Sequence, residues 1–257
     1  MGRHALAMLY PQQYETMIAA CNKANEPLEI HEQQTFPENH AVVMGRLLGM
    51  WNVPSSVYHP LVYTLEPYET LARLPQPLRQ RVELVKTAVM IGQLAVATWD
   101  DWDRIELPPD FVIEHLGLTD LSTVLKRTQA DLKAIEGFQT GGCLGPEPST
   151  RAADSRKVAY CNLSANSFDF FAALLTSMGI DHEPCDLGNI GAQPVLVSGI
   201  GKSWQEINAQ VAKHLDGVKC LIVLDEDRFA QSAVRDGVLT LPTSIGALRQ
   251  GLQSLQN

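Results

Sequence analysis

Residues 195–224 read VLVSGIGKSWQEINAQVAKHLDGVKCLIVL, and this stretch decides the fold of the second half of the chain. Two apolar runs of strand length, 195–197 and 220–224, flank a helical stretch from Trp204 to Leu215. Parallel strands buried on both faces read as continuous apolar runs, and a helix connects one strand to the next. The stretch therefore predicts a strand–helix–strand unit of a parallel sheet.

The same alternation extends to both sides of this unit. Further apolar runs lie at 158–161 and 238–241, and helical stretches lie at 168–178 and 245–255. Gly179 directly follows the first of these helical stretches and is expected to end it. We therefore predict a small doubly wound parallel α/β sheet over residues 157–257, with helices on both faces.

The first half of the chain follows a helical period instead. Asn39 is a good N-cap, and Pro54 starts a further helix. Apolar residues after Asn39 recur at helical spacing along one stripe: Val43, Met44, Leu47, Leu48 and Trp51. A long helix from 78 to about 98 is expected to turn four valines toward one core: Val82, Val85, Val89 and Val96. We predict an all-helical domain over 1–138 and a Gly/Pro-rich linker over 139–156.

Composition narrows the class of protein. The 257 residues are 45% hydrophobic, which is enough to form real cores. The net charge is −9, and so acidic a chain disfavours nucleic acid and anionic membranes as partners. The 5 cysteines include no C-x-x-C pair, which indicates reduced thiols rather than a disulfide framework or a zinc site. We expect a soluble, cytoplasmic protein.

The first half resembles the HDOD domain, the non-catalytic relative of the HD and HD-GYP phosphohydrolases. The resemblance lies in G-R-H-A-L at 2–6 with Y-P-Q-Q-Y at 10–14, in Glu32 followed by H-A-V-V-M-G at 40–45, and in L-G-M-W-N-V-P at 48–54. It covers roughly residues 1–116, a partial domain within the usual domain range. It implies that the N-terminal helices of such a domain, with its His-Asp position, would lie before Met1.

The resemblance also implies a loss of metal chemistry. HD-GYP relatives carry a His-His pair where this chain has Thr64 and Leu65. A dinuclear phosphohydrolase needs imidazole and carboxylate ligands around two metals that activate water. Neither a threonine nor a leucine can supply these ligands.

The second half resembles a receiver domain, which has a flavodoxin-like fold. A working receiver needs acidic residues after its first strand, an aspartate nucleophile after its third, a hydroxyl after its fourth and a lysine after its fifth. Here the corresponding strands end at Asn162 and Ser164, at Ser198, at Asp225 and at Pro242. The resemblance therefore implies a degenerate pseudo-receiver without aspartyl phosphorylation.

Several residues keep a catalytic or metal-binding interpretation open. His40, Asp101, Asp225 and Glu226 are weak metal candidates, with Glu32 near His40 and Asp100 and Asp103 near Asp101. The alternative for these residues is a structural or solvated role. G-I-G-K-S at 199–203 suggests a phosphate-binding loop but lacks its first glycine, and Ser203 with Glu206 fits a capping box. Trp51 and Trp204 are expected in the core.

We therefore expect a non-enzymatic bacterial signal-transduction scaffold without cofactors. Its partner would be a signalling protein or a second copy, held through the helical domain. The alternative is a metal-dependent phosphohydrolase or nucleotide-binding enzyme with a non-standard site.

Overall fold

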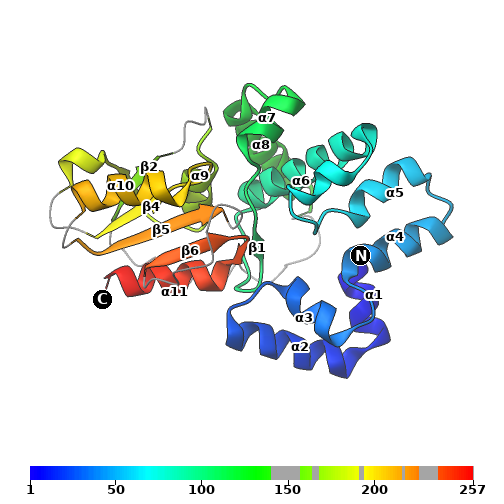
Figure 1. Ribbon diagram of the computed structural model, residues 1–257. Coiled ribbons are helices and arrows are strands. Elements are labelled where there is room, and N and C mark those ends of the chain that lie inside the picture. Colours follow the sequence, from blue (N-terminus) through cyan, green and yellow to red (C-terminus); the bar gives the residue numbers. More distant parts are fainter. Residues whose placement is uncertain (140–156, 164–167, 191–193, 216–217, 226–236, 257) are drawn as a thin grey trace. The chain divides into compact units, whose positions relative to one another are not determined.

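The computed structural model describes residues 1–139, 157–163, 168–190, 194–215, 218–225 and 237–256 (Figure 1). The chain divides into two compact units. Unit 1 comprises Met1–Val89, Asp100–Gly117 and Thr243–Ala247, and unit 2 comprises Met90–Trp99, Leu118–Pro242 and Leu248–Asn257. Nearly all of the predicted linker, 140–156, lies outside the described residues. The predicted domain boundaries at 138 and 157 stay a prediction.

Unit 1 is mainly helical. Its described elements are α1 (Gly2–Leu9), α2 (Pro11–Ala24), α3 (Leu28–Thr35), α4 (His40–Met50), α5 (Ser55–Val62), the 3₁₀ turn η1 (Thr70–Arg73), the first part of α6 (Gln76–Val96), β1 (Arg104–Ile105), α7 (Asp110–Leu116) and β7 (Thr243–Ser244). Asn39 caps α4 as predicted, because its Oδ1 accepts the N–H groups of Ala41 and Val42 at 3.1 Å each. A core of apolar residues lies between α1, α2 and α3: Leu6, Met17, Cys21, Leu28 and Phe36.

Two expectations for the buried faces of these helices are wrong. The buried residues of α4 are Ala41 and Gly45, while Trp51 is 58% exposed. In α6, Val82 is buried, but Val89 and Val96 are about half exposed. Gly45 is buried because α5 approaches its backbone closely at Val62, while Val43, Met44, Leu47 and Leu48 are half-buried.

Unit 2 is an α/β unit. Its described elements are the end of α6, α8 (Leu121–Gln139), β2 (Val158–Asn162), α9 (Phe170–Ser177), β3 (His182–Pro184), the 3₁₀ turn η2 (Leu187–Asn189), β4 (Val195–Ser198), α10 (Trp204–His214), β5 (Cys220–Asp225), β6 (Val238–Leu241) and most of α11 (Ile245–Gln256). The strand order is β3-β2-β4-β5-β6, and all four pairings are parallel. The chain therefore adds β3 on one side of β2 and the later strands on the other side, so the strand order reverses between β2 and β4.

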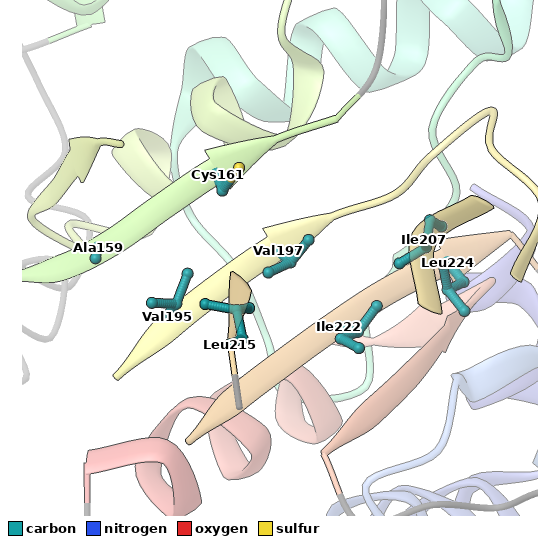
Figure 2. Packing of buried hydrophobic residues seen from close by; sticks show 8 residues of the cluster. All are labelled: Ala159, Cys161, Val195, Val197, Ile207, Leu215, Ile222 and Leu224. Carbon is teal, nitrogen blue, oxygen red and sulfur yellow. The ribbon is translucent and has the colours of Figure 1, made fainter. Parts of the chain in front are cut away.

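Side chains alternate between the two faces of this sheet. One face packs against α10 and η2 in a cluster shown in Figure 2: Ala159, Cys161, Val195, Val197, Ile207, Leu215, Ile222 and Leu224. On the other face, the Tyr160 and Phe171 ring centroids lie 6.1 Å apart. Gly251 of α11 packs on the same face, because a Cβ on it would lie 3.1 Å from Leu221 Cδ2. Trp204 packs against the first cluster and is half-buried.

The predicted fold class, a helical region followed by a doubly wound parallel sheet, is confirmed. None of the helices within the described ranges is both long enough and apolar enough to cross a membrane.

Candidate functional site

The helices at the start of the chain approach one another at glycines. A Cβ on Gly2 would overlap the His40 carbonyl, and a Cβ on Gly45 would overlap the Val62 side chain. Gly2 therefore allows α1 to cross the start of α4, and Gly45 allows α4 to pack closely on α5. These are the glycines of the G-R-H and H-A-V-V-M-G stretches.

Glu32 and His40 form a buried pair at this crossing. Glu32 is 0% exposed, and its Oε2 lies 2.6 Å from His40 Nδ1 and 3.0 Å from the His40 backbone nitrogen. Glu32 thus ties α3 to the start of α4.

A second charged cluster joins α1, α3 and the loop 100–103. Arg3 Nη2 lies 3.5 Å from Glu29 Oε1, and Arg3 Nη1 lies 3.9 Å from Asp103 Oδ1. Glu29 is buried. Burial raises the pKa of Asp103, although the Asp100 N–H and the Arg3 charge act in the opposite direction. The arginine of the G-R-H stretch therefore bridges two carboxylates.

Helix α6 carries a buried polar face that the sequence analysis did not predict. Glu83 is 0% exposed, with Oε1 at 2.6 Å from Arg79 Nε and Oε2 at 2.8 Å from His115 Nδ1 of α7. A second cluster lies one turn further along α6. The signal that could have found both is the spacing of Arg79, Glu83 and Lys86 along one helical face.

The second α6 cluster centres on Lys86, which is 7% exposed. Its Nζ lies 3.0 Å from both carboxylate oxygens of Glu106, donates to the Glu66 carbonyl, and lies 4.2 Å from the Tyr68 ring centroid. Burial lowers the pKa of Lys86, and Glu106 opposes that shift. Arg104 also pairs with Glu106, at 3.1 Å. The amine is fully engaged in holding this part of unit 1 together.

The described metal candidates, His40 and Asp101, are engaged in their own local contacts. Within the described ranges, no three His, Cys, Asp or Glu side chains are grouped so that they could hold a metal ion. His40 is paired with Glu32, and the Asp100 N–H donates to Asp103 Oδ2 at 2.8 Å in a local turn. The Asp101 carbonyl accepts the Gly246 N–H. The Asp225 side chain and all of Glu226 lie outside the described residues.

At the carboxyl edge of the sheet, one carboxylate missed by the sequence analysis organises the polar groups. Asp169 caps α9 through the Ala172 N–H at 2.9 Å. Its oxygens also accept Asn162 Nδ2 at 2.7 Å and the Tyr160 hydroxyl at 2.9 and 3.0 Å. Burial, with the Asp169 charge, raises the pKa of Tyr160. Asn162, at the first receiver-like acidic position, is therefore engaged with a helix cap.

The capping interpretation of 199–203 is confirmed. The Glu206 N–H donates to Ser203 Oγ at 3.3 Å, and the Ser203 N–H donates to Glu206 Oε2 at 2.8 Å. The Ser203 N–H would face a phosphate bound at this loop, but it donates to Glu206 instead. The N-terminus of α10 is therefore capped by its own side chains.

The glycine crossings, the Glu32–His40 pair and the Arg3–Glu29 contact all lie in the first five helices. The HDOD domain model matches residues 1–67. No curated protein and no solved structure matched the chain. The match is shorter than the resemblance over 1–116 and includes α1 to α5, here called the HDOD segment. HDOD domains are related to the HD superfamily. At the end of the HDOD segment, the Thr64 hydroxyl donates to the Leu61 carbonyl at 2.8 Å.

Proposed function

We propose that this chain is a non-enzymatic signal-transduction regulator of the bacterial cytoplasm that works through protein–protein contacts of its HDOD segment. One observation carries the proposal. Large apolar side chains of the HDOD segment face solvent, with Met8 83%, Leu9 68%, Met50 76%, Trp51 58% and Val57 55% exposed. Exposed apolar groups of this size on neighbouring helices are typical of an interaction surface.

Three of these residues belong to one hairpin. Met50 and Trp51 end α4, and Val57 lies in the first turn of α5. The two helices are packed at Gly45 and Gly49, so the hairpin is a rigid platform. We call Met50, Trp51 and Val57 the hairpin tip. Aromatic and methionine side chains are enriched at the centres of protein interfaces, which favours the tip as the contact point.

The engagement of the polar groups supports a non-catalytic role. Glu32 and His40 bind each other, Arg3 bridges Glu29 and Asp103, and Thr64 is tied to a backbone carbonyl. A water-activating centre needs ligands that converge with a free coordination position. The charge of −9 further disfavours nucleic acid and anionic membranes as partners.

The test is the mass of the purified chain over a range of concentrations, measured by sedimentation equilibrium. We expect self-association at micromolar concentrations, weakened by Trp51→Glu by about tenfold or more, since an interfacial tryptophan commonly contributes about 2 kcal/mol. Val124→Glu, on the exposed side of α8 outside the HDOD segment, is the matched control, because Val124 is 42% exposed.

Two results would overturn the proposal. One is a strictly monomeric chain that also loses no cellular crosslinked partner when Trp51 is replaced by Glu. The other is turnover of a phosphoester by the purified chain that Glu32→Gln and His40→Ala abolish without unfolding it.

A further inference from the structure

Five residues near the end of the chain are bound into unit 1. The segment Thr243–Ala247 belongs to unit 1, whereas the residues before and after it belong to unit 2. Its strand β7 pairs antiparallel with β1. Beyond the strand, the N–H groups of Ile245 and Gly246 donate to carbonyls of the loop 101–103 at 2.9 and 2.8 Å. Ser244 and Ile245 are 0% exposed, so the segment is buried and not laid on the surface.

The fit of the segment is specific. Ser244 Oγ donates to the Asn25 carbonyl at the end of α2 and accepts the Ala247 N–H at 3.1 Å. A Cβ on Gly246 would lie 2.6 Å from Asn25 Oδ1 and 3.0 Å from the Asp101 carbonyl oxygen. Asn25 itself has a left-handed backbone, with φ of 54°. Only a small residue at 246 and a hydroxyl at 244 satisfy this receptor surface.

Both flanks of the segment are anchored in unit 2. Before it, β6 pairs with β5 along the edge of the sheet. After it, Leu248 and Leu252 of α11 are buried, and Gly251 faces Leu221 of β5. The segment is therefore continuous in the chain with a sheet strand at one end and with a packed helix at the other.

The receptor surface reaches the HDOD segment through the loop that binds the strand. In this loop the Trp102 carbonyl accepts the Leu28 N–H at the start of α3, at 3.2 Å. The Asp103 carboxylate faces Arg3 at 3.9 Å, and Arg3 faces Glu29 at 3.5 Å. One Glu29 oxygen is buried without a hydrogen-bond partner, which makes this cluster sensitive to a shift of the loop.

We propose that Thr243–Ala247 is an internal ligand of unit 1, and that its docking makes the contact between Arg3 of the HDOD segment and Asp103 of the loop depend on the integrity of the C-terminal sheet. In the docked state the segment holds the loop 101–105 against α2 and α3. When β6 or α11 loosens, the segment leaves, the loop moves, and Arg3 loses one of its two carboxylates. Such a docking equilibrium is a regulatory device, because a ligand or modification that alters the sheet changes the HDOD segment.

The first test is amide hydrogen exchange on the full chain. Gly246→Ala places a methyl group 2.6 Å from Asn25 Oδ1 and 3.0 Å from the Asp101 carbonyl oxygen and is expected to undock the segment. Exchange over 101–105 and at Leu28 should become about tenfold faster or more, because several buried hydrogen bonds are lost together. The strands β2 and β4 should keep their protection. Ser254→Ala is the matched control, since Ser254 Oγ donates to the Gly251 carbonyl within α11.

The second test perturbs the sheet instead. Leu174 of α9 is 0% exposed, and Leu174→Ala should accelerate exchange in β2 and also over 101–105. In a chain that already carries Gly246→Ala, Leu174→Ala should cause no further increase in amide exchange over 101–105. Unchanged protection of 101–105 in both Gly246→Ala and the milder Ser244→Ala would overturn the proposal, as would a Leu174→Ala effect confined to unit 2.

Discussion

Replacing Gly45 by alanine isolates the energetic cost of the close α4–α5 approach. In a helix interior, glycine is roughly 1 kcal/mol less favourable than alanine, so on propensity alone the change should stabilise α4. The new Cβ, however, would overlap the Val62 side chain and come within 3.9 Å of Tyr58 Cδ2. Overpacking of this kind costs about 1–3 kcal/mol. We therefore expect Gly45→Ala to be neutral to about 2 kcal/mol destabilising.

Gly92 of α6 offers a matched control. It is also inside a helix, but a Cβ there would meet no atom within 4 Å. Gly92→Ala should therefore stabilise the protein by about 0.5–1 kcal/mol. Urea unfolding followed by circular dichroism compares the midpoints of the two variants, and exchange of the α4 and α6 amides assigns each change to its helix.

A double-mutant cycle identifies the cause. Val62→Ala removes the methyl groups that the new Cβ would meet, so the pair Gly45→Ala with Val62→Ala should be less destabilised than the sum of the single changes by about 0.5–2 kcal/mol. A Gly45→Ala variant as stable as Gly92→Ala would refute the packing argument. So would strict additivity in the cycle.

The buried charges and thiols give two further predictions. Glu83→Ala leaves Arg79 and His115 without their shared carboxylate and should destabilise unit 1 by about 1–3 kcal/mol, measured by urea unfolding. The control Glu114→Ala, on the exposed side of α7, should change the free energy of unfolding by less than about 0.5 kcal/mol. Equal effects of the two variants would contradict a structural role for Glu83. Burial raises the pKa of the Cys21 and Cys161 thiols from 9.0 to about 11, so both should resist alkylation at neutral pH. Because the folded state holds the higher pKa, their contribution to stability is complete below about pH 9 and is lost as the pH rises toward 11. Rapid alkylation of both thiols in the native chain at pH 7 would contradict this burial.

The α/β half could be predicted from the sequence because each buried strand leaves a local signature. Runs such as 195–197 and 220–224 are apolar on both faces of the sheet, and Ser203 with Glu206 marks the start of the helix between them. Strand β7 leaves no comparable signature. Its two residues pair with Arg104–Ile105, far away in sequence, and no local pattern specifies a long-range partner.

The candidate site was harder to predict because burial there follows backbone approach and charge pairing. The apolar stripe of α4 correctly indicated a helix, but Trp51 at its C-terminal end is 58% exposed. Glu83 and Lys86 interrupt the apolar run of this helix, and charged residues are seldom fully buried unless they are paired. Their partners, His115 and Glu106, come from other segments and could not be assigned from helix periodicity alone.

The docking of Thr243–Ala247 also orders the events of biosynthesis. A ribosome releases the N-terminal helices early, yet β1 finds its partner strand only after the α/β region has been translated. At about 5–20 residues per second, the delay between Gly117 and Thr243 is roughly 6–25 seconds. During that interval the nascent helical unit presents the edge of β1 and the Asn25 end of α2 uncovered. Chaperones that shield nascent chains would have their clearest task on this stretch.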